Sequence, residues 1–239
     1  MPTRIKKLQA FASHLLDGMI YLRERYAILE PMLADRDVQH NFGSGSRRRG
    51  FDVLRYSLVL ACIQDIAKFT TDKDARTPSV HNIVRGLDDD TLRQLRDEFA
   101  DWNFPIPAEY ADDREILAAL KRIDAREESE RREQFDSLYA DMRSRWMALE
   151  ASPTLRSFRT VRDKVSAHTE IKYVADKYQP VRIEDLGITR ADLSTVINDL
   201  QEIVELLGLI VRNAGFAWDM LDEQLSRASR DFWALADNS

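Results

Sequence analysis

The feature that most constrains this chain is the recurrence of apolar residues at intervals of three and four along most of its length. That spacing places apolar side chains on one face of an α-helix. Strand-like alternation is scarce, and only eight glycines and seven prolines occur in 239 residues. Leu, Ala, Arg, Asp and Glu dominate, which is the composition of helices joined by short turns. We therefore expect an all-α helical bundle, because little of the chain could build a sheet.

Length and charge set further limits. The chain has 239 residues, of which 44% are hydrophobic, enough for a single domain over residues 1–239. Its formal net charge of −6 repels nucleic acid and anionic membranes as a whole, so contact with phosphate requires a local basic patch. No stretch approaches the roughly 18 apolar residues of a membrane span. We expect a cytoplasmic protein without membrane contact, in which the single cysteine, Cys62, serves packing.

The first part of the chain predicts two long helices separated by a loop. One runs from Ile5 to about Leu33, with Pro31 marking a kink or end. The other, Phe51 to Phe69, is the most apolar segment and belongs in the middle of the bundle. Between them NFGSGSRRRG, residues 41–50, is predicted to be a loop. The loop contains Arg47, Arg48 and Arg49. These arginines either contact RNA phosphates or belong to a solvated loop without a partner.

A short helix from Thr77-Pro78 to Leu87 follows, and then a helix from Thr91 to Trp102 with Asp90 as its N-cap. Residues 109–150 are predicted to form a projecting, charged helical segment. Its centre, DAREESERRE at 124–133, has no large apolar residue, which indicates a charged tip or an exposed arm laced with ion pairs.

Ser152 and Pro153 fit the N-cap and first residue of a helix within residues 151–173. A connecting loop is expected from Tyr173 to Thr189, because it contains Pro180 and Gly187. Helices are predicted at 191–211 and from there to about Leu235. The last helix is rich in aromatic residues, so we expect it to dock on the core or on a second subunit.

The segment from Leu155 to Tyr173 carries the chemistry. Arg162 interrupts an apolar stripe of helical spacing, and His168 ends a neighbouring stripe. At about 100° per residue, both lie roughly 60° to either side of Val165. A permanent cation and a group that titrates near neutral pH are seldom placed on a packing face unless they are paired or used.

The run Arg162-Asp163-Lys164-Val165-Ser166-Ala167-His168 resembles the signature of the HEPN superfamily: an Arg, four to six residues and a His, often with a polar residue directly after the Arg. FDVLRYSLVLACIQDIAKFT and TDKDARTPSVHNIVRGL look like the early helix pair of its abortive-infection branch. The resemblance covers most of the chain. It implies a HEPN-like bundle, a toxin or phage-defence role, and a homodimer in which two motifs share a cleft.

Residues 155–177 are net positive in a net-negative protein, which would attract phosphate. A neutral imidazole at His168 can take the proton of a ribose 2′-hydroxyl, and the Arg162 guanidinium can hold phosphate oxygens. This pair predicts a metal-independent endoribonuclease without a cofactor. The candidates for binding RNA are Arg156, Arg159, Lys164 and Lys172.

Two secondary roles and one alternative complete the sequence-based hypothesis. Asp163 would pair with an arginine, and Ser166 could bond phosphate. In-line cleavage favours one acid and one base on opposite sides of the phosphate, and one histidine can serve as only one of them at a given moment. A dimer would supply a histidine for each role. Alternatively, His168 caps a helix and Arg162 bridges an acidic residue, in a non-catalytic module that binds RNA, an antitoxin or a nucleotidyltransferase. The remaining histidines, at no metal-ligand spacing, are interpreted as surface or cap residues: His14, His40 and His81.

Overall fold

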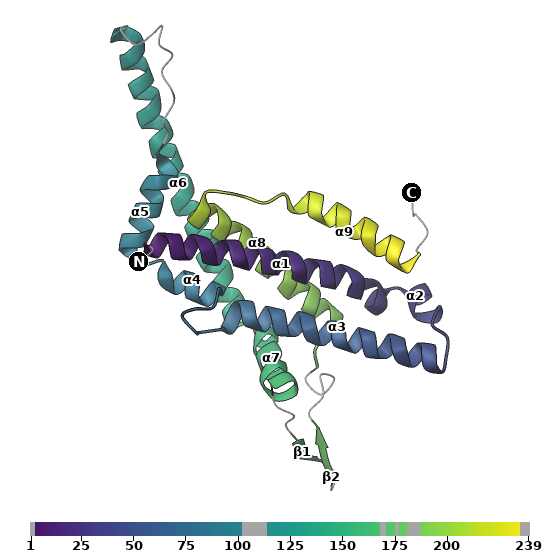
Figure 1. Cartoon of the computed structure of the whole chain (residues 1–239). Coiled ribbons are helices and arrows are strands. Elements are labelled where there is room, and N and C mark those ends of the chain that lie inside the picture. Colours follow the sequence, from purple (N-terminus) through teal and green to yellow (C-terminus); the bar gives the residue numbers. More distant parts are fainter. Residues whose placement is uncertain (1–2, 102–113, 168–170, 175–176, 181–186, 235–239) are drawn as a thin grey trace.

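The computed structural model describes residues 3–101, 114–167, 171–174, 177–180 and 187–234 (Figure 1). Apart from one short hairpin these residues form helices and their connections, so the expected all-α bundle is confirmed. The helical elements are α1 (Arg4–Ala34), α2 (Arg36–His40), α3 (Ser46–Thr71), α4 (Val80–Gly86), α5 (Asp89–Ala100), α6 (Arg114–Ala151), α7 (Pro153–Val161), a π-helix η2 (Arg162–Ala167), α8 (Arg190–Arg212) and α9 (Trp218–Trp233).

The core lies between α1, α3, α6 and α8. Helix α1 packs on α3 and α8, and α8 packs in turn on α6 (Figure 1). Apolar side chains of α1 are buried at every third or fourth position, and a fully buried Leu, Ile or Met side chain contributes about 1.5–3 kcal/mol. They are Ile5, Leu8, Ala12, Leu15, Met19, Leu22, Tyr26, Leu29 and Met32.

Proline at position 31 does not end α1, which continues to Ala34. A proline has no N–H, so it leaves the carbonyl of residue 27 without its helical donor. The Ser229 hydroxyl of α9 donates to this Ala27 oxygen at 2.6 Å. Trp233 Nε1 donates to the Ile28 oxygen at 3.0 Å. These two bonds show α9 docked on α1, one of the two positions that its aromatic residues predicted.

The segment 41–50 is a loop only in its first half. Helix α3 begins at Ser46, after a turn in which Gly43 and Gly45 adopt positive φ angles of 52° and 73°. The prediction failed because arginine is a good helix former and the run is tied to its surroundings. Arg48 donates to Asp52 one turn ahead and to the Gln39 carbonyl, both at 3.2 Å.

Helix α3 is central only in its second half, where Cys62, Ile63 and Ile66 are buried. Its first half leaves three apolar side chains in solvent, although the sequence predicted a helix in the middle of the bundle. Val53 is 60% exposed, and Leu54 and Tyr56 are 41% and 40% exposed.

The charged segment is one unbroken helix of 38 residues, α6, whose N-terminal part projects beyond the bundle (Figure 1). Residues 124–133, predicted as its tip or as an exposed arm, reach the junction with α5. Arg131 Nε donates to the Phe99 carbonyl at 2.8 Å, and Arg132 pairs with Asp97 at 3.3 Å. Within α6, Arg126 pairs with Glu127 and Glu130 and Arg132 pairs with Glu128, so the expected ion pairs along the segment are present together with the one to α5.

The α5 cap is also shifted. Asp88, and not Asp90, accepts the Thr91 N–H at 3.0 Å, so the helix begins at Asp89. Asp90 lies in the first turn, where the helix dipole also favours a carboxylate.

The expected connecting loop after Tyr173 instead contains a hairpin of β1 (Ile171–Val174) and β2 (Lys177–Pro180). The strands are antiparallel, with Ile171 opposite Pro180 and Val174 opposite Lys177. Strands of four residues are too short for their alternation to stand out in the sequence. Within the described ranges, no helix has both the length and the apolar character needed to cross a bilayer.

Candidate functional site

Helix α7 presents the predicted motif. Ser152 caps it by accepting the Leu155 N–H at 3.1 Å, and Pro153 occupies its first position, as predicted. Its apolar face is fully buried through Leu155, Phe158 and Val161. This face packs the helix against α3, so the backbone position from which the Arg162 side chain starts is fixed.

From Arg162 to Ala167 the α-helix gives way to a π-helix. Hydrogen bonds then run from i to i+5, which widens each turn, and such segments are frequent at functional sites. The angular estimate of 100° per residue therefore applies only as far as Val161. The sequence contained no signal for this change, because the same residues can form either bonding pattern.

The Arg162 guanidinium is held from two sides. Its Nε donates to Asp163 Oδ1 at 2.8 Å, and its Nη1 donates to Thr71 Oγ1 at 2.7 Å. The side chain remains 36% exposed. Arg162 is thus fixed in direction while one part of it stays open to solvent.

Thr71 was not predicted as a site residue. It is the last residue of α3, and its hydroxyl also donates to the Ala67 carbonyl at 2.6 Å. That second bond orients the oxygen so that its lone pairs are open to Arg162. The only hint in the sequence was the Thr70-Thr71 pair that ends an apolar run.

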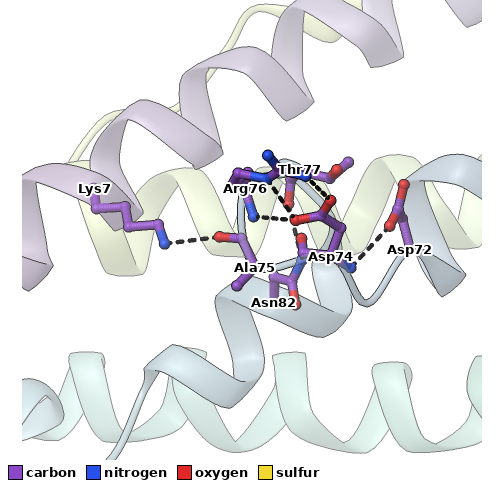
Figure 2. Close-up of polar contacts among 7 residues, drawn as sticks. All are labelled: Lys7, Asp72, Asp74, Ala75, Arg76, Thr77 and Asn82. Carbon is purple, nitrogen blue, oxygen red and sulfur yellow. Dashed lines mark hydrogen bonds and ion pairs between the residues drawn. The ribbon is translucent and has the colours of Figure 1, made fainter.

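The turn after Thr71 is braced by its own side chains (Figure 2). Asp74 accepts the Arg76 backbone N–H at 3.0 Å and the Arg76 guanidinium at 2.8 Å. The Arg76 bonds hold the pKa of the Asp74 carboxyl below its usual range. Asn82 of α4 donates to two carbonyls of the turn, and Lys7 of α1 donates to the Ala75 carbonyl at 2.7 Å.

The other predicted site residues are placed unevenly. Arg156 is exposed on α7, whereas Arg159 and Lys164 are half-buried. Arg159 Nε is buried and has no hydrogen-bond partner among the described residues. Lys172 belongs to β1. His168 lies outside the described residues, as do the side chains of Ser166 and Lys172.

No group of three or more His, Cys, Asp or Glu side chains in the described ranges could hold a metal ion. His14 and His40 are exposed, and His81 lies 4.0 Å from Glu150. These positions agree with the interpretation of all three as surface or cap residues.

An all-helical bundle with this motif at the end of a helix defines a protein of the HEPN class. The model of the AbiU2 family, a HEPN-type abortive-infection family, matches residues 5–232, and the chain belongs to that family. No curated protein and no solved structure matches the chain. Membership assigns the protein an abortive-infection function of the HEPN type.

Proposed function

We propose that the protein is a metal-independent endoribonuclease that acts as a toxin or phage-defence effector. The observation that carries the proposal is the state of Arg162, which is held by Asp163 and Thr71 and still partly exposed. Arg162 is therefore fixed in direction and can still be reached by a ligand from solvent. Family membership supports a defence role, and the basic residues around the motif support an anionic substrate.

The geometry of Arg162 suits a phosphate. A guanidinium has five N–H groups in one plane. Asp163 accepts from the Nε–H and lies 2.8 Å from Nη2, and Thr71 accepts from one N–H of Nη1. Within the described residues, each terminal nitrogen therefore keeps at least one N–H without a hydrogen-bond acceptor. A parallel pair of donors matches two phosphate oxygens.

His168 would act as the base. It takes the proton of a ribose 2′-hydroxyl, the 2′-oxygen bonds to phosphorus, and the bond from phosphorus to the 5′-oxygen breaks. The products are a 2′,3′-cyclic phosphate and a 5′-hydroxyl. Arg162 stabilises the additional negative charge on the phosphate oxygens. DNA is not cut, because it lacks the attacking hydroxyl.

Neighbouring residues would bind the RNA strand and complete the site. Arg156, Arg159, Lys164 and Lys172 would hold phosphates, and Ser166 would donate a hydrogen bond. A single histidine cannot serve on both sides of the phosphate at once, so we propose a dimeric site to which a second copy contributes.

The test uses purified protein and labelled RNA in excess EDTA. We expect His168→Ala to lose roughly 10²–10⁴ in rate with an unchanged circular dichroism spectrum. Arg162→Ala should strongly reduce the cleavage rate. Arg162→Lys should not restore it, because an ammonium lacks the planar pair of donors of a guanidinium. A 2′-deoxy nucleotide at the cut position should abolish cleavage. His81→Ala is the matched control and should keep full activity.

Unchanged cleavage by His168→Ala would refute the mechanism.

A second function is favoured by one observation: Asp163 and Thr71 already give Arg162 partners, as a purely structural arginine requires. In that case the protein is a non-catalytic module that binds RNA, an antitoxin or a nucleotidyltransferase. Tight RNA binding by the wild type without cleavage of any RNA tested would favour this function.

A further inference from the structure

The first half of α3 carries a concentration of positive charge that the candidate site does not use. Residues 45–57 contain four arginines and one aspartate, in a protein whose formal net charge is −6. The aspartate, Asp52, is already paired: one of its oxygens lies 3.2 Å from Arg48 Nε and the other lies 3.2 Å from Arg55 Nη2. Within the described ranges, the exposed Arg49 forms no ion pair. This end of the molecule therefore has positive charge left over to attract an anionic ligand.

A hollow of about 650 Å³ opens on the same surface. Arg49, Val53 and Tyr56 line it, and their spacing of four and then three residues places them on one face of α3. Val53 and Tyr56 are both exposed, although neither side chain is charged. A guanidinium, an aliphatic side chain and an aromatic ring thus follow one another along an open surface.

This order of exposed groups fits a single strand of RNA better than a helix of a protein partner. A guanidinium donates two parallel hydrogen bonds to a phosphate, and an unpaired base stacks on an aromatic ring. A helical partner would instead require a continuous apolar seam. Val53 and Leu54, the exposed aliphatic residues of this half, do not form one, because neighbours in sequence point about 100° apart on a helix.

We propose that the first half of α3 is a binding surface for single-stranded RNA, in which Arg49 binds a phosphate and Tyr56 stacks on a base. Val53, between them on the same face, gives the base an apolar contact. The surface is remote from Arg162: Thr71, which accepts the Arg162 hydrogen bond, is 22 residues beyond Arg49 on the same helix, roughly 33 Å at about 1.5 Å per residue. Figure 1 shows this half of α3 extending away from α7 towards α2.

The separation predicts that long RNAs use this surface and short ones do not. In a stacked strand, at about 3.4 Å per nucleotide, roughly ten nucleotides cover 33 Å, whereas four cover about 14 Å. A strand bound at Tyr56 can therefore reach Arg162 only if it is much longer than a tetranucleotide. This consequence rests on the ribonuclease function proposed above, whereas the binding surface does not.

The chain offers a matched control for Tyr56. A second hollow, of about 630 Å³, lies between α1 and α3 and is lined by another exposed tyrosine, Tyr21. This hollow carries three carboxylates against two cations. Its charge does not favour phosphate, so an exposed tyrosine is present there without the surroundings that RNA requires.

Binding is measured by fluorescence anisotropy with the purified full chain and a labelled 2′-O-methyl RNA of about twenty nucleotides, which cannot be cut because its 2′-oxygens are blocked. We expect Tyr56→Ala to weaken binding roughly tenfold and Tyr56→Phe to keep it, because the phenylalanine ring still stacks. Arg49→Ala should weaken binding and reduce the slope of log affinity against log salt by about 0.7, the contribution of one phosphate in a single strand. Tyr21→Ala and Arg227→Ala, an exposed arginine of α9, should bind like the wild type.

Three results overturn the binding surface. They are a wild type that does not bind the RNA, wild-type affinity in both Arg49→Ala and Tyr56→Ala, and equal weakening by the control variants. Light scattering of the same samples identifies a protein contact. If the α3 variants change the oligomeric state and leave RNA affinity unchanged, this face joins copies of the chain and the proposal is wrong.

Cleavage tests the link to Arg162. In excess EDTA, kcat/KM is compared for an RNA of about twenty nucleotides and for a tetranucleotide with the same cut position. We expect the wild type to prefer the longer RNA and Tyr56→Ala to reduce this preference roughly tenfold, through KM. A preference that Tyr56→Ala leaves unchanged overturns the link, because the ring then does not act on the distant part of the strand.

The two failures are distinguishable. If the wild type cuts no RNA but binds 2′-O-methyl RNA through Arg49 and Tyr56, the ribonuclease function fails and the binding surface stands. If the wild type cuts RNA and neither substitution on α3 changes binding, the surface is wrong and the ribonuclease function stands.

Discussion

Replacing Thr71 by valine tests whether α3 positions Arg162. The change keeps the shape of the side chain and removes the oxygen that accepts from Arg162 Nη1 at 2.7 Å. A hydrogen bond to a charged group is worth about 1.5–3 kcal/mol. Arg162 is 36% exposed, so water replaces part of the bond, and we discount the loss to about 0.5–1 kcal/mol. Thr71→Val should lower the free energy of unfolding by this amount in urea denaturation.

The same substitution should slow cleavage. Arg162 keeps its bond to Asp163 but loses its second anchor, so its guanidinium samples directions that miss the phosphate. We expect a threefold to tenfold loss in kcat/KM, since about 1.4 kcal/mol corresponds to a factor of ten. Single-turnover cleavage of labelled RNA measures this loss. Thr71→Ser keeps the hydroxyl and should keep the rate.

Thr70→Val is the matched control. Its hydroxyl donates to the Ile66 carbonyl at 2.7 Å, so the substitution removes a comparable helix bond one residue away. It should lower stability and leave the cleavage rate unchanged. Equal losses in cleavage for Thr70→Val and Thr71→Val, or none for Thr71→Val, would show that Thr71 does not position Arg162.

Three further predictions concern packing and titration. Gly18→Ala places a Cβ 2.5 Å from Phe69 Cζ and should cost roughly 1–2 kcal/mol in urea unfolding despite the better helix propensity of alanine; no loss would mean that the ring moves aside. Burial raises the pKa of the Cys62 thiol to about 12, so alkylation at pH 8, followed by mass spectrometry, should occur only after unfolding. The Thr189 hydrogen bonds hold the pKa of Asp192 below its usual range. Its stabilisation is therefore present above the ordinary carboxyl pKa and lost as the pH falls through the lower folded value, and Asp192→Asn should flatten this part of the curve of unfolding free energy against pH.

Sequence periodicity predicted the parts of the fold that depend on local burial. Helix α8 is an example: a helix was expected at 191–211, and its apolar residues at helical spacing, Leu193, Val196, Ile197 and Leu200, are all buried. The Ser152 cap and the Pro153 start were predicted because a cap involves residues only a few positions apart. Arg162 next to Asp163 was accessible to the same reasoning.

Contacts between distant residues were not accessible. Thr71 and Arg162 are 91 residues apart, and no pattern within a helix encodes which hydroxyl a guanidinium will reach. The bonds from Arg131 to the Phe99 carbonyl and from Arg48 to the Gln39 carbonyl were missed for the same reason, since these partners lie on other elements. The roles of His168 and Ser166, and the dimer, stay predictions.

The turn between α3 and α4 has a consequence for the order of assembly. Apart from the bond that Lys7 donates, its bonds join residues two to eight positions apart, such as Asp74 to Arg76 and Ser79 to Asp72. Contacts between near neighbours form quickly, because little chain entropy is lost in closing them. We expect α3, this turn and α4 to form an early unit in which the Thr71 hydroxyl already points outward. Arg162, much later in the chain, then forms its hydrogen bond to a Thr71 hydroxyl that is already in place.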